Sequence, residues 1–384
     1  MNKTIGQRIL DRVSVPLVAW VAALLVYGTV MVASATSSMN SGSGMLLRHL
    51  FGIGVGLVPL AVAWFIDYTR LRGWQGPLIA LGAFLLISPR IPGLGGTAKG
   101  ATSWLEIAGM RLFQPSEPAK LIFIVIFAAV IANMKGRVDT PSRITKALLY
   151  LAGAVFLILL QPDLGTGMVF VAIAMVMLVV GGMKAKHFAF LAIAAAVFVG
   201  AILGVDAGLD EMAGRDVGLK DYQKNRLLVF VNPDIDPTDA GYNLAQSKIA
   251  IGSGGLTGKG LGSGTQSNLH FIPERHTDFI FSVLGEELGF FGAVLLLGLY
   301  LALLLTALAI ANSSRDLYGA LIATGVLGMW LFQILENVGM TVGMMPITGI
   351  PLPFMSFGSS SMVTNLGAVG LLLSVWSRRY GAGS

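Results

Sequence analysis

The chain of 384 residues contains no cysteine, and charged side chains are scarce. The missing thiols exclude disulfide bonds, a thiolate nucleophile and a cysteine-ligated metal. Only 12% of the residues are charged, compared with about 25% in a typical soluble domain, while 55% are hydrophobic. This composition excludes a water-soluble globular domain and indicates that a membrane is the main solvent of the chain.

Long apolar runs divide the chain into about ten candidate transmembrane helices, since roughly 20 apolar residues are needed to cross a bilayer as a helix. We therefore expect an all-α integral membrane protein that forms one polytopic domain over residues 1–384. The short run 76–89 and the near contact of two runs at Gln161-Pro162-Asp163 leave a broken or re-entrant helix pair open. The predicted helices are 15–35, 46–66, 76–89, 115–134, 144–160, 165–182, 187–204, 278–311, 319–340 and 352–377.

A long polar stretch, residues 205–277, separates the seventh predicted helix from the eighth. A loop of this size is usually functional or disordered. The connectors predicted on the other side are rich in basic residues, so the positive-inside rule places both termini in the cytoplasm and the 205–277 loop outside. This topology explains the net charge of +6 without a nucleic-acid partner. The basic connector residues are Lys3, Arg8, Arg12, Arg70, Arg72, Lys135, Arg137, Arg143, Lys146, Lys184, Lys186, Arg315, Arg378 and Arg379.

The first apolar run follows a basic start and reaches Ala33-Ser34-Ala35, a small-residue pattern that a signal peptidase could cleave. Its apolar stretch is longer than the hydrophobic region of a signal peptide usually is. An uncleaved membrane anchor is therefore the better interpretation.

Charged residues near the start of two predicted helices are candidates for function. Glu117 and Lys120 are three residues apart, so they share one helical face and can pair. A charge near hydrocarbon is costly unless it is paired or faces a wet cavity. The alternative is an ordinary interfacial helix start with Pro115 and Pro118 in its first turn. Asp163 could line the same polar cavity or simply cap the helix that follows it.

The densest polar cluster runs from Pro273 to Asp278 and leads directly into a long apolar helix. Asp278 is thus placed at the membrane surface near a positive helix end. It could be a plain helix cap, although Glu274, Arg275 and His276 beside it make that interpretation less simple. Burial would raise the pKa of such a carboxylate and a nearby cation would lower it, so it could accept a proton from a sugar hydroxyl.

Several other polar groups lie inside or beside apolar runs. Glu286, Glu287, Glu336 and Asn337 are expected to form hydrogen bonds within the bundle. The glycine-rich stretch 252–260 lacks the Ser or Thr that a phosphate-binding loop requires after its Lys, so no nucleotide site is predicted.

Metal ligation has little support in the sequence. Asp234-Ile235-Asp236 matches the carboxylate pair of nucleotide-sugar transferases, but the prolines that flank it indicate turns. The histidines do not show ligand spacing, so no metal site is assigned. The histidines are His49, His187, His270 and His276.

Six short motifs follow one another along most of the chain: Lys99–Ala101, Phe113–Glu117, Gln161–Thr166, Ala250–Gly255, Arg275–Phe279 and Pro351–Ser356. Taken together, they resemble the SEDS family (shape, elongation, division, sporulation). Within it, Gln246–Ile249 and Pro273–His276 resemble the RodA branch rather than the FtsW branch. The sequence departs from common family patterns at Ser103 and at Phe357-Gly358-Ser359.

The resemblance implies a ten-helix fold and a peptidoglycan glycosyltransferase that polymerises lipid II into glycan strands for cell elongation and rod shape. Asp278 occupies the position of the essential aspartate, and it would act as general base on the 4-hydroxyl of the acceptor lipid II. This hydroxyl would attack the donor glycan on its undecaprenyl diphosphate. Candidate substrate-binding or cavity residues are Glu117, Lys120, Asp163, Arg111, Arg275 and His276.

The leaving diphosphate needs positive charge, for which Arg111, Lys120 and Arg275 are candidates, with or without a divalent cation such as Mg or Mn. The resemblance also implies the bacterial cytoplasmic (inner) membrane as location, and as partners a class B penicillin-binding protein (transpeptidase) and other elongation-complex proteins. Two other classes remain open. One is a flippase or transporter for lipid-linked precursor, and the other is a noncatalytic scaffold of the elongation complex.

Overall fold

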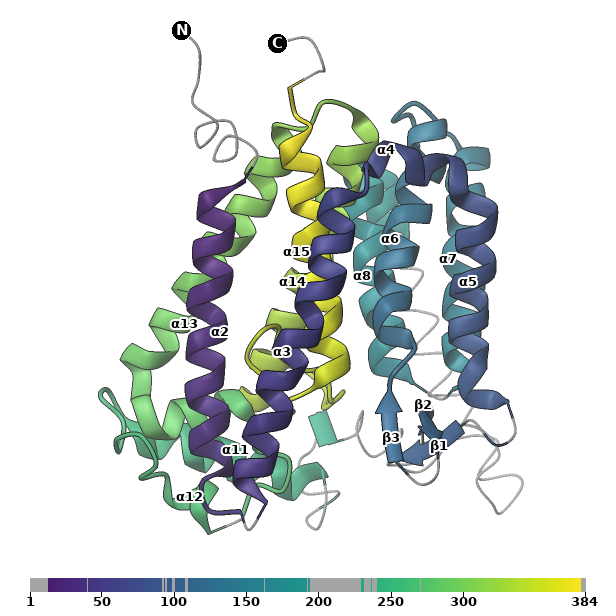
Figure 1. The fold of residues 1–384 in the computed structure, drawn as a ribbon. Helices are drawn as coiled ribbons and strands as arrows, with labels where there is room; N and C mark the ends of the chain where they lie inside the picture. The colour runs from purple at the N-terminus through teal and green to yellow at the C-terminus, as the bar shows by residue number, and fades with distance from the viewer. Residues whose placement is uncertain are drawn as a thin grey trace, which may run out of the picture.

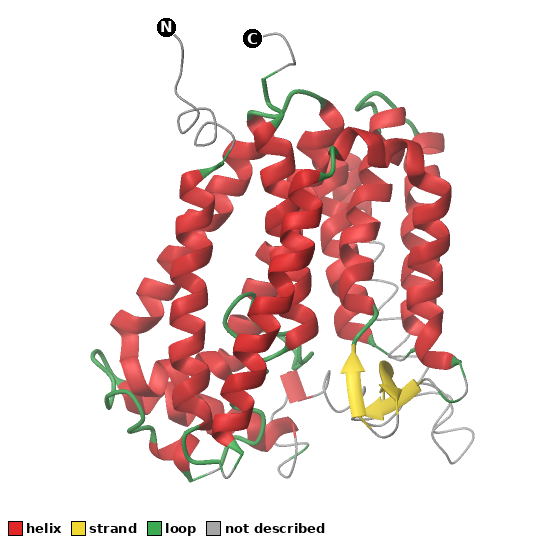
Figure 2. Ribbon diagram, in the orientation of Figure 1, coloured by secondary structure: helices red, strands yellow, loops and turns green. Residues whose placement is uncertain are grey.

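The computed structural model shows a bundle of long helices with a small β-sheet at one end (Figures 1 and 2). The predicted helical membrane protein is confirmed, because eight helices in the described part of the chain are long and apolar enough to cross a bilayer. The described residues are 13–39, 41–91, 93, 95–98, 101–107, 110–161, 163–191, 193, 229–230, 236, 240–269 and 271–380.

These eight spans account for most of the predicted helices, and a ninth apolar helix, α8 (Leu164–Val180), is slightly shorter. Of the predicted helix 187–204, residues 187–191 and 193 are described and are helical, and the other residues lie outside the described ranges. The spans are α2 (Val15–Thr36), α3 (Gly42–Phe65), the composite span Tyr68–Arg90, α6 (Ser116–Asn133), α7 (Pro141–Leu159), α13 (Ile280–Asn312), α14 (Leu317–Val342) and α15 (Ser359–Ser377).

Two regions that the sequence left uncertain are helical in the structure. The short run predicted at 76–89 belongs to the composite span, which consists of α4 (Tyr68–Leu71), η1 (Arg72–Trp74), α5 (Gln75–Ile87) and η2 (Ser88–Arg90). The runs on either side of Gln161 are the separate helices α7 and α8, which pack against each other (Figure 1). Neither is a re-entrant half-helix.

The start of the last predicted helix is wrong. The apolar run begins at residue 352, but α15 begins only at Ser359. Pro351 and Pro353 lack the amide hydrogen that a helix needs, and Phe354 has a positive φ of 61°. Residues 343–358 therefore form a loop, called here the 343–358 loop.

The all-α expectation also missed a three-stranded antiparallel sheet with strand order β1-β2-β3. It consists of β1 (Gly95–Ala98), β2 (Ala101–Ile107) and β3 (Met110–Phe113), and β3 leads into α6 (Figure 2). Only two residues link each pair of strands, and both links end in glycine, which is a hairpin signal. A search for long apolar runs does not detect strands of this length.

The described part of the long polar stretch contains two helices, α11 (Ala240–Gly254) and α12 (Thr265–Asn268). Helix α11 packs against α13 and α14. Leu244 and Ala250 on α11 share a small hydrophobic core with Phe279 and Met340. This segment is therefore a packed layer over one end of the bundle, called here the loop end, where the 343–358 loop and the sheet also lie (Figure 1).

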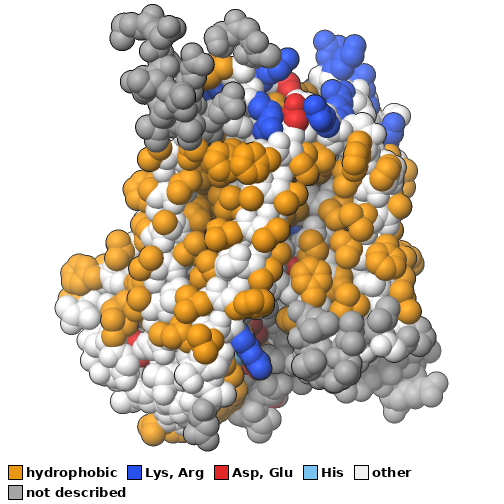
Figure 3. Space-filling model, viewed as in Figure 1, with side chains coloured by type: hydrophobic (Ala, Val, Ile, Leu, Met, Phe, Trp, Pro, Cys, Tyr) orange, Lys and Arg blue, Asp and Glu red, His pale blue; other side chains and the backbone are white. Residues whose placement is uncertain are grey.

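Lys and Arg side chains gather at the opposite end, called here the basic end, above a broad hydrophobic surface (Figure 3). Connectors far apart in sequence meet there. Arg72 donates to Oδ1 of Asn133 at 2.6 Å, and the hydroxyl of Tyr68 donates to Asp316 at 3.1 Å. The clustering that the sequence predicts is therefore present in the three-dimensional arrangement.

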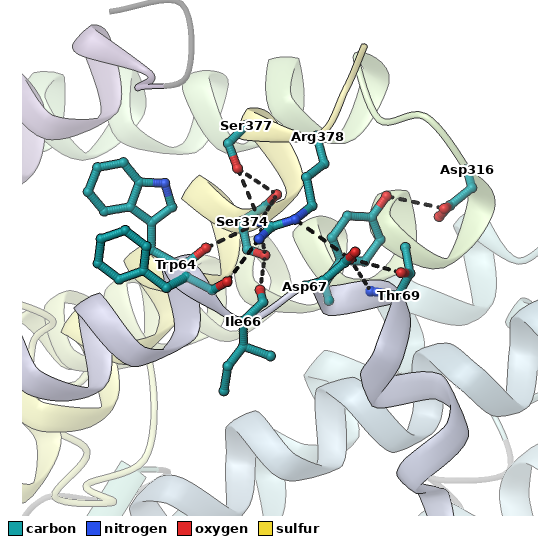
Figure 4. Close-up of polar contacts among 10 residues, drawn as sticks. Trp64, Ile66, Asp67, Thr69, Asp316, Ser374, Ser377 and Arg378 are labelled. Atoms are coloured by element: carbon teal, nitrogen blue, oxygen red, sulfur yellow. Dashed lines mark hydrogen bonds and ion pairs between the residues drawn. The ribbon is translucent and has the colours of Figure 1, made fainter. Parts of the chain in front are cut away.

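Arg378, just after α15, fastens the ends of α3 and α15 together at the basic end (Figure 4). Its guanidinium donates to the backbone oxygens of Trp64 and Phe65 and lies 3.6 Å from the carboxylate of Asp67. Partial burial acts to raise the pKa of Asp67, but hydrogen bonds from Thr69 and the Arg378 charge outweigh it, so the pKa lies below its usual value.

Candidate active site

Asp278 lies immediately before α13, in a turn that a neighbouring helix holds by its backbone. Helix α13 begins at Ile280 with Phe279 as its N-cap residue, so Asp278 does not occupy the capping position. Nδ2 of Asn337, on α14, donates to the backbone oxygen of Asp278 and to that of Ile350, each at 2.8 Å. Asn337 thereby joins the turn that carries Asp278 to the 343–358 loop.

The 343–358 loop also binds His276 and Thr277, the two residues before Asp278. The backbone amide of Phe357 donates to the carbonyl of His276 at 2.9 Å. The hydroxyl of Ser356 donates to the carbonyl of Thr277 at 2.6 Å. The ring of His276 also lies 5.5 Å from that of Phe357. With the Asn337 bond, the carbonyls of three consecutive residues, 276–278, each accept a hydrogen bond from another element. Such a turn is held in one conformation.

The loop backbone also comes close to the Asp278 carboxylate. Gly349 has a φ of +74°, and a Cβ atom built on it would lie 3.2 Å from Oδ2 of Asp278. A larger residue at this position would be strained and would crowd the carboxylate. Asp278 itself is half-buried. The close backbone approach therefore sets the space around this side chain.

Asp163 is a helix cap that lies against the same loop. Its carboxylate accepts hydrogen bonds from the amide and the hydroxyl of Thr166, at 3.0 and 2.8 Å, so the capping role is confirmed. A Cβ on Gly165 would lie 3.1 Å from the backbone oxygen of Thr348 and 3.4 Å from Ile350. The start of α8 is thus packed against the part of the loop that Asn337 joins to Asp278.

Glu117 and Lys120 form the predicted ion pair on α6. Their side chains are 2.8 Å apart and only 4% and 2% exposed. The second carboxylate oxygen of Glu117 is buried and has no hydrogen-bond partner among the described residues. The amide of Gln114 donates to the hydroxyl of Ser360 at 3.0 Å. The start of α6 therefore lies beside the start of α15, directly after the 343–358 loop.

The 343–358 loop is the element on which the predicted site residues converge. Asp278, Asp163 and the pair formed by Glu117 and Lys120 come from the starts of three helices, and each start borders this loop or the residues that directly follow it. Asn337 forms hydrogen bonds within the bundle, as the sequence predicted. The sequence did not indicate that Asn337 and Ser356 tie this loop to the turn before α13. The available signal was their polarity at buried positions within apolar runs.

Arg275 was expected to face the leaving diphosphate, but in the structure its guanidinium binds other parts of the protein. Its side chain is 1% exposed, and its guanidinium donates to the backbone oxygens of Ala35 and Ser267 and to the hydroxyl of Ser38. Burial lowers the pKa of Arg275. The arginine thus joins the end of α2 to α12, which favours a positioning role. Arg111 lies on β3 opposite Glu106, and its side chain is outside the described residues.

Glu286 and Glu287 are fully buried and hydrogen-bonded, as expected. Their partners come from α12, from α2 and, for one bond, from the loop before α12. Glu286 accepts from Nζ of Lys259 at 2.7 Å and from the backbone amide of Gln266 at 2.9 Å. Glu287 accepts from the hydroxyl of Ser34 on α2. Glu286 therefore attaches Lys259 and α12 to the start of α13, and Glu287 attaches α2 to it.

In the described part of the chain, the carboxylates and histidines are not gathered around a common point. Within the described ranges, three or more His, Asp or Glu side chains do not come together as a metal site. Asp236 accepts from the amide of Ala240 at the start of α11, and Asp234 lies outside the described residues.

An apolar cavity of about 430 Å³ lies between α5, α6, α7 and α8. Its lining includes Leu86, Ala119 and Phe123. Ala119 directly precedes Lys120, and the backbone oxygen of Leu86 accepts a hydrogen bond from the buried Gln161. The cavity therefore adjoins the layer of polar side chains near the loop end, and its chemistry suits a hydrocarbon chain.

Replacing Asn337 by leucine is expected to lower the catalytic rate at least tenfold while leaving the affinity for substrate nearly unchanged. The change keeps the number and branching of the heavy side-chain atoms but removes the hydrogen bonds to the backbone oxygens of Asp278 and Ile350, which join the turn to the 343–358 loop. The cost is about 1–3 kcal/mol for each buried carbonyl left unpaired. The measurement is kcat and KM for polymerisation. The matched control is Asn365→Leu, which breaks hydrogen bonds to Trp330 and Ser361 and should reduce stability only. Equal kcat losses in both variants would contradict the positioning role.

Lys120→Met is expected to destabilise the protein by about 3–5 kcal/mol, because it leaves the buried Glu117 carboxylate without its cation. The double variant that also contains Glu117→Gln should recover most of the stability but little of the activity. Melting temperature and polymerisation rate, measured in parallel, test this separation. Full activity in the stable double variant would show that the pair is only structural.

Comparison with known proteins shows the family to which the chain belongs. The model of the FtsW, RodA and SpoVE proteins, described as cell cycle protein, matches residues 15–380. The chain is 36% identical to a probable peptidoglycan glycosyltransferase FtsW of Geobacter sp. (strain M18), over 94% of this chain and 95% of the relative. It is 36% identical to stage V sporulation protein E of Bacillus subtilis, over 92% and 93%, and 35% identical to the peptidoglycan glycosyltransferase MrdB of Escherichia coli, over 93% and 91%.

Solved structures agree with this assignment. A chain from a structure titled "Structural coordination of polymerization and crosslinking by a peptidoglycan synthase complex" is 32% identical, with a TM-score of 0.75 over 95% of this chain and 98% of that one. RodA of Thermus thermophilus is 31% identical, with a TM-score of 0.67 over 95% and 96%. Identities of 35–36% to FtsW, SpoVE and MrdB do not separate the branches. The chain belongs to the SEDS family, the family of FtsW, RodA and SpoVE.

Proposed function

We propose that this chain is a peptidoglycan glycosyltransferase that polymerises lipid II into glycan strands. The observation that carries the proposal is the Asp278 turn, whose three consecutive carbonyls are hydrogen-bonded to α14 and the 343–358 loop. A carboxylate fixed in this way is suited to one defined proton transfer. FtsW of Geobacter and MrdB of Escherichia coli, to which the chain is similar, are named peptidoglycan glycosyltransferases.

In the proposed reaction, Asp278 takes the proton from the 4-hydroxyl of the acceptor lipid II. The hydroxyl oxygen then forms a bond to the anomeric carbon of the donor glycan, and the bond from that carbon to the undecaprenyl diphosphate breaks. Positioned general bases contribute about 10²- to 10⁴-fold to such reactions. Lys120 and Arg111 are the proposed sources of positive charge for the departing diphosphate, with a divalent cation as an untested addition.

The prenyl tails of the substrates need an apolar environment while their sugars react. The cavity between α5 and α8 adjoins the polar layer that contains Lys120, so we propose that it accommodates part of one tail. The embedding of the whole enzyme in the membrane follows from the same requirement, since lipid-linked diphosphates stay at the bilayer surface.

Within the family, we propose that the chain belongs to the elongation branch. The motifs Gln246–Ile249 and Pro273–His276 favour a RodA-type role in cell elongation and rod shape. We propose a class B penicillin-binding protein as partner, together with other elongation-complex proteins, because a structural neighbour comes from a peptidoglycan synthase complex. Expression of the gene in cells depleted of either their elongation or their division polymerase tests the choice, since only the matching loss should be rescued.

The proposed topology follows the positive-inside rule. We propose a single polytopic domain in the bacterial cytoplasmic membrane, with both termini in the cytoplasm. Residues 205–277 then lie outside, on the same side as Asp278. The concentration of Lys and Arg at the basic end supports this orientation (Figure 3).

The direct test is polymerisation by the purified protein, alone and with its transpeptidase, from labelled lipid II. Moenomycin is added to silence contaminating polymerases of the other class. Long glycan chains on a gel support the proposal. Transfer of lipid II across vesicle membranes without polymer would instead favour a flippase, and the absence of both activities, even with the partner, would favour a scaffold.

A further inference from the structure

The long helix α13 is broken at Gly289, where φ is 63° and ψ is −158°. The break separates a short segment, 280–288, from a long apolar segment, 290–312. A break interrupts the hydrogen-bond ladder of the helix and leaves backbone groups that need other partners. In a membrane such groups cannot turn to water, so each must be bonded within the protein.

Residues 254–262, the glycine-rich stretch between α11 and α12, supply these partners and are called here the 254–262 loop. Two backbone amides of the loop donate to carbonyls before the break, and two carbonyls of the loop accept from amides after it. The four bonds are Lys259 to Glu286 at 3.0 Å, Gly260 to Glu287 at 2.9 Å, Phe290 to Gly255 at 2.9 Å and Phe291 to Leu256 at 3.1 Å.

The glycines of the loop permit this backbone contact. Gly258 has a φ of +78°, and a Cβ on it would lie 2.1 Å from the backbone oxygen of Glu287. A Cβ on Gly289 would likewise lie 2.4 Å from the backbone nitrogen of Gly258. The backbone of the loop and the backbone of α13 at Gly289 are too close to leave room for side chains between them. This contact explains a glycine-rich stretch that does not bind a nucleotide.

The exposed side chains of the loop are two leucines and the uncharged Thr257. Leu256 is 66% exposed and Leu261 is 52% exposed, beside Phe290 at 57% and Phe291 at 61%. The ammonium group of Lys259, the one charged side chain in the loop, is 2.7 Å from the buried Glu286. The outer surface of the loop therefore presents mainly leucine, and its one charged side chain is paired.

This surface continues onto the lipid-facing side of α13. Just after the two phenylalanines, Val294 and Leu295 are 48% and 58% exposed on the long apolar segment. The loop projects sideways from the bundle next to the break in α13 (Figure 1). Since Leu256 is bonded directly to Phe291, the loop lies at the depth where the apolar half of α13 begins.

We propose that the 254–262 loop inserts into the edge of the bilayer, with Leu256 and Leu261 in contact with phospholipid acyl chains beside Phe290 and Phe291. Apolar side chains of interfacial segments reach about 5–10 Å into the boundary between headgroups and chains. Phospholipid is the favoured occupant because the surface is continuous with the lipid-facing side of α13. Insertion does not depend on the proposed enzymatic activity.

The insertion has a consequence for the site. The segment 280–288 connects Asp278 at its start to Gly289 at its end. An anchor at Gly289 therefore holds Asp278 at a fixed depth relative to the membrane surface. Lipid-linked diphosphates lie at that surface, so the anchor would keep the carboxylate and its substrates at matching depths.

The absence of cysteine allows a direct test with single-cysteine variants. Leu256→Cys and Leu261→Cys are labelled with a small environment-sensitive fluorophore and placed, one copy per disc, in phospholipid nanodiscs. The quenchers are a lipid with a nitroxide high on its acyl chain and, separately, iodide in the buffer. Leu295→Cys is the lipid-facing reference, and Ser313→Cys, exposed at the basic end, is the aqueous reference. Gel filtration and melting temperature confirm that each variant is folded.

Both loop labels should resemble the Leu295 label, with at least twofold stronger quenching by the nitroxide lipid than by iodide. Labels that resemble the Ser313 label would overturn the proposal and place the loop in water. Protection from both quenchers would also overturn it, because it would mean that protein covers the leucines. Polymerisation activity is not needed for this measurement, so its result stands apart from the proposed function.

Discussion

Asp278→Asn is expected to abolish polymer formation from lipid II while leaving the protein folded. Asparagine has nearly the same shape but cannot accept a proton from the sugar hydroxyl, so the contribution of the general base, about 10²- to 10⁴-fold, is lost. The fold should survive because the hydrogen bonds that hold residues 276–278 are made to backbone carbonyls. Gel analysis of labelled glycan, with moenomycin present, measures the effect.

A matched control for this variant is Asp67→Asn. Asp67 is a carboxylate at the basic end, near Arg378, and lies outside the proposed site. Its replacement removes one negative charge in the same way and should leave the polymerisation rate within about twofold of wild type, since an exposed ion pair contributes at most about 1 kcal/mol. Polymer made by the Asp278 variant at a rate similar to that of the control would rule out proton transfer by this aspartate.

The parts of the fold that were predictable are those that depend on local composition. Long apolar runs predict membrane helices because length and hydropathy together decide whether a helix can cross a bilayer. The pairing of Glu117 with Lys120 was predictable as well, because a spacing of three residues places two side chains on one helical face. Asp278 was singled out among the candidate residues by its resemblance to a family motif and not by a physical argument from the sequence.

The parts that were missed depend on contacts between distant residues. The 343–358 loop contains enough apolar residues to resemble a helix, and its shape is held by hydrogen bonds to Thr277 and Asn337. The guanidinium of Arg275 binds Ala35 and Ser38, which are about 240 residues away in the chain. Hydrophobicity patterns do not contain that information. They also do not reveal the break at Gly289, because the residues on both sides of it are apolar.

The two elements that were missed have a common effect on the site. The 343–358 loop holds the turn before α13, and the 254–262 loop bonds to the break at the other end of the same short segment. Asp278 is therefore held by backbone contacts on both sides. A small change in either contact should therefore shift the position of the Asp278 carboxylate, although the contacts are made by other residues.

Gly254→Ala is expected to be strongly damaging although it lies outside the polar site. Gly254 is the last residue of α11, and a Cβ on it would lie 1.9 Å from the backbone oxygen of Gly285 and 3.0 Å from that of Glu286. Both atoms belong to the backbone of α13, so the clash is relieved only if the two helices move apart. Overpacking of this kind costs about 1–3 kcal/mol, and more when backbone cannot yield.

Separation of α11 from α13 would also break the bonds between the 254–262 loop and the helix break, leaving backbone groups unpaired at about 1–3 kcal/mol each. We therefore expect a clearly lower melting temperature and at least a tenfold loss of polymerisation rate. Gly252→Ala is the control, since Gly252 lies on the same helix, is exposed, and a Cβ on it would have nothing within 4 Å. Alanine is favoured over glycine in a helix by about 1 kcal/mol, so this variant should be at least as stable as wild type. A Gly254 variant that melts with the Gly252 control would show that α11 does not pack directly against the backbone of α13.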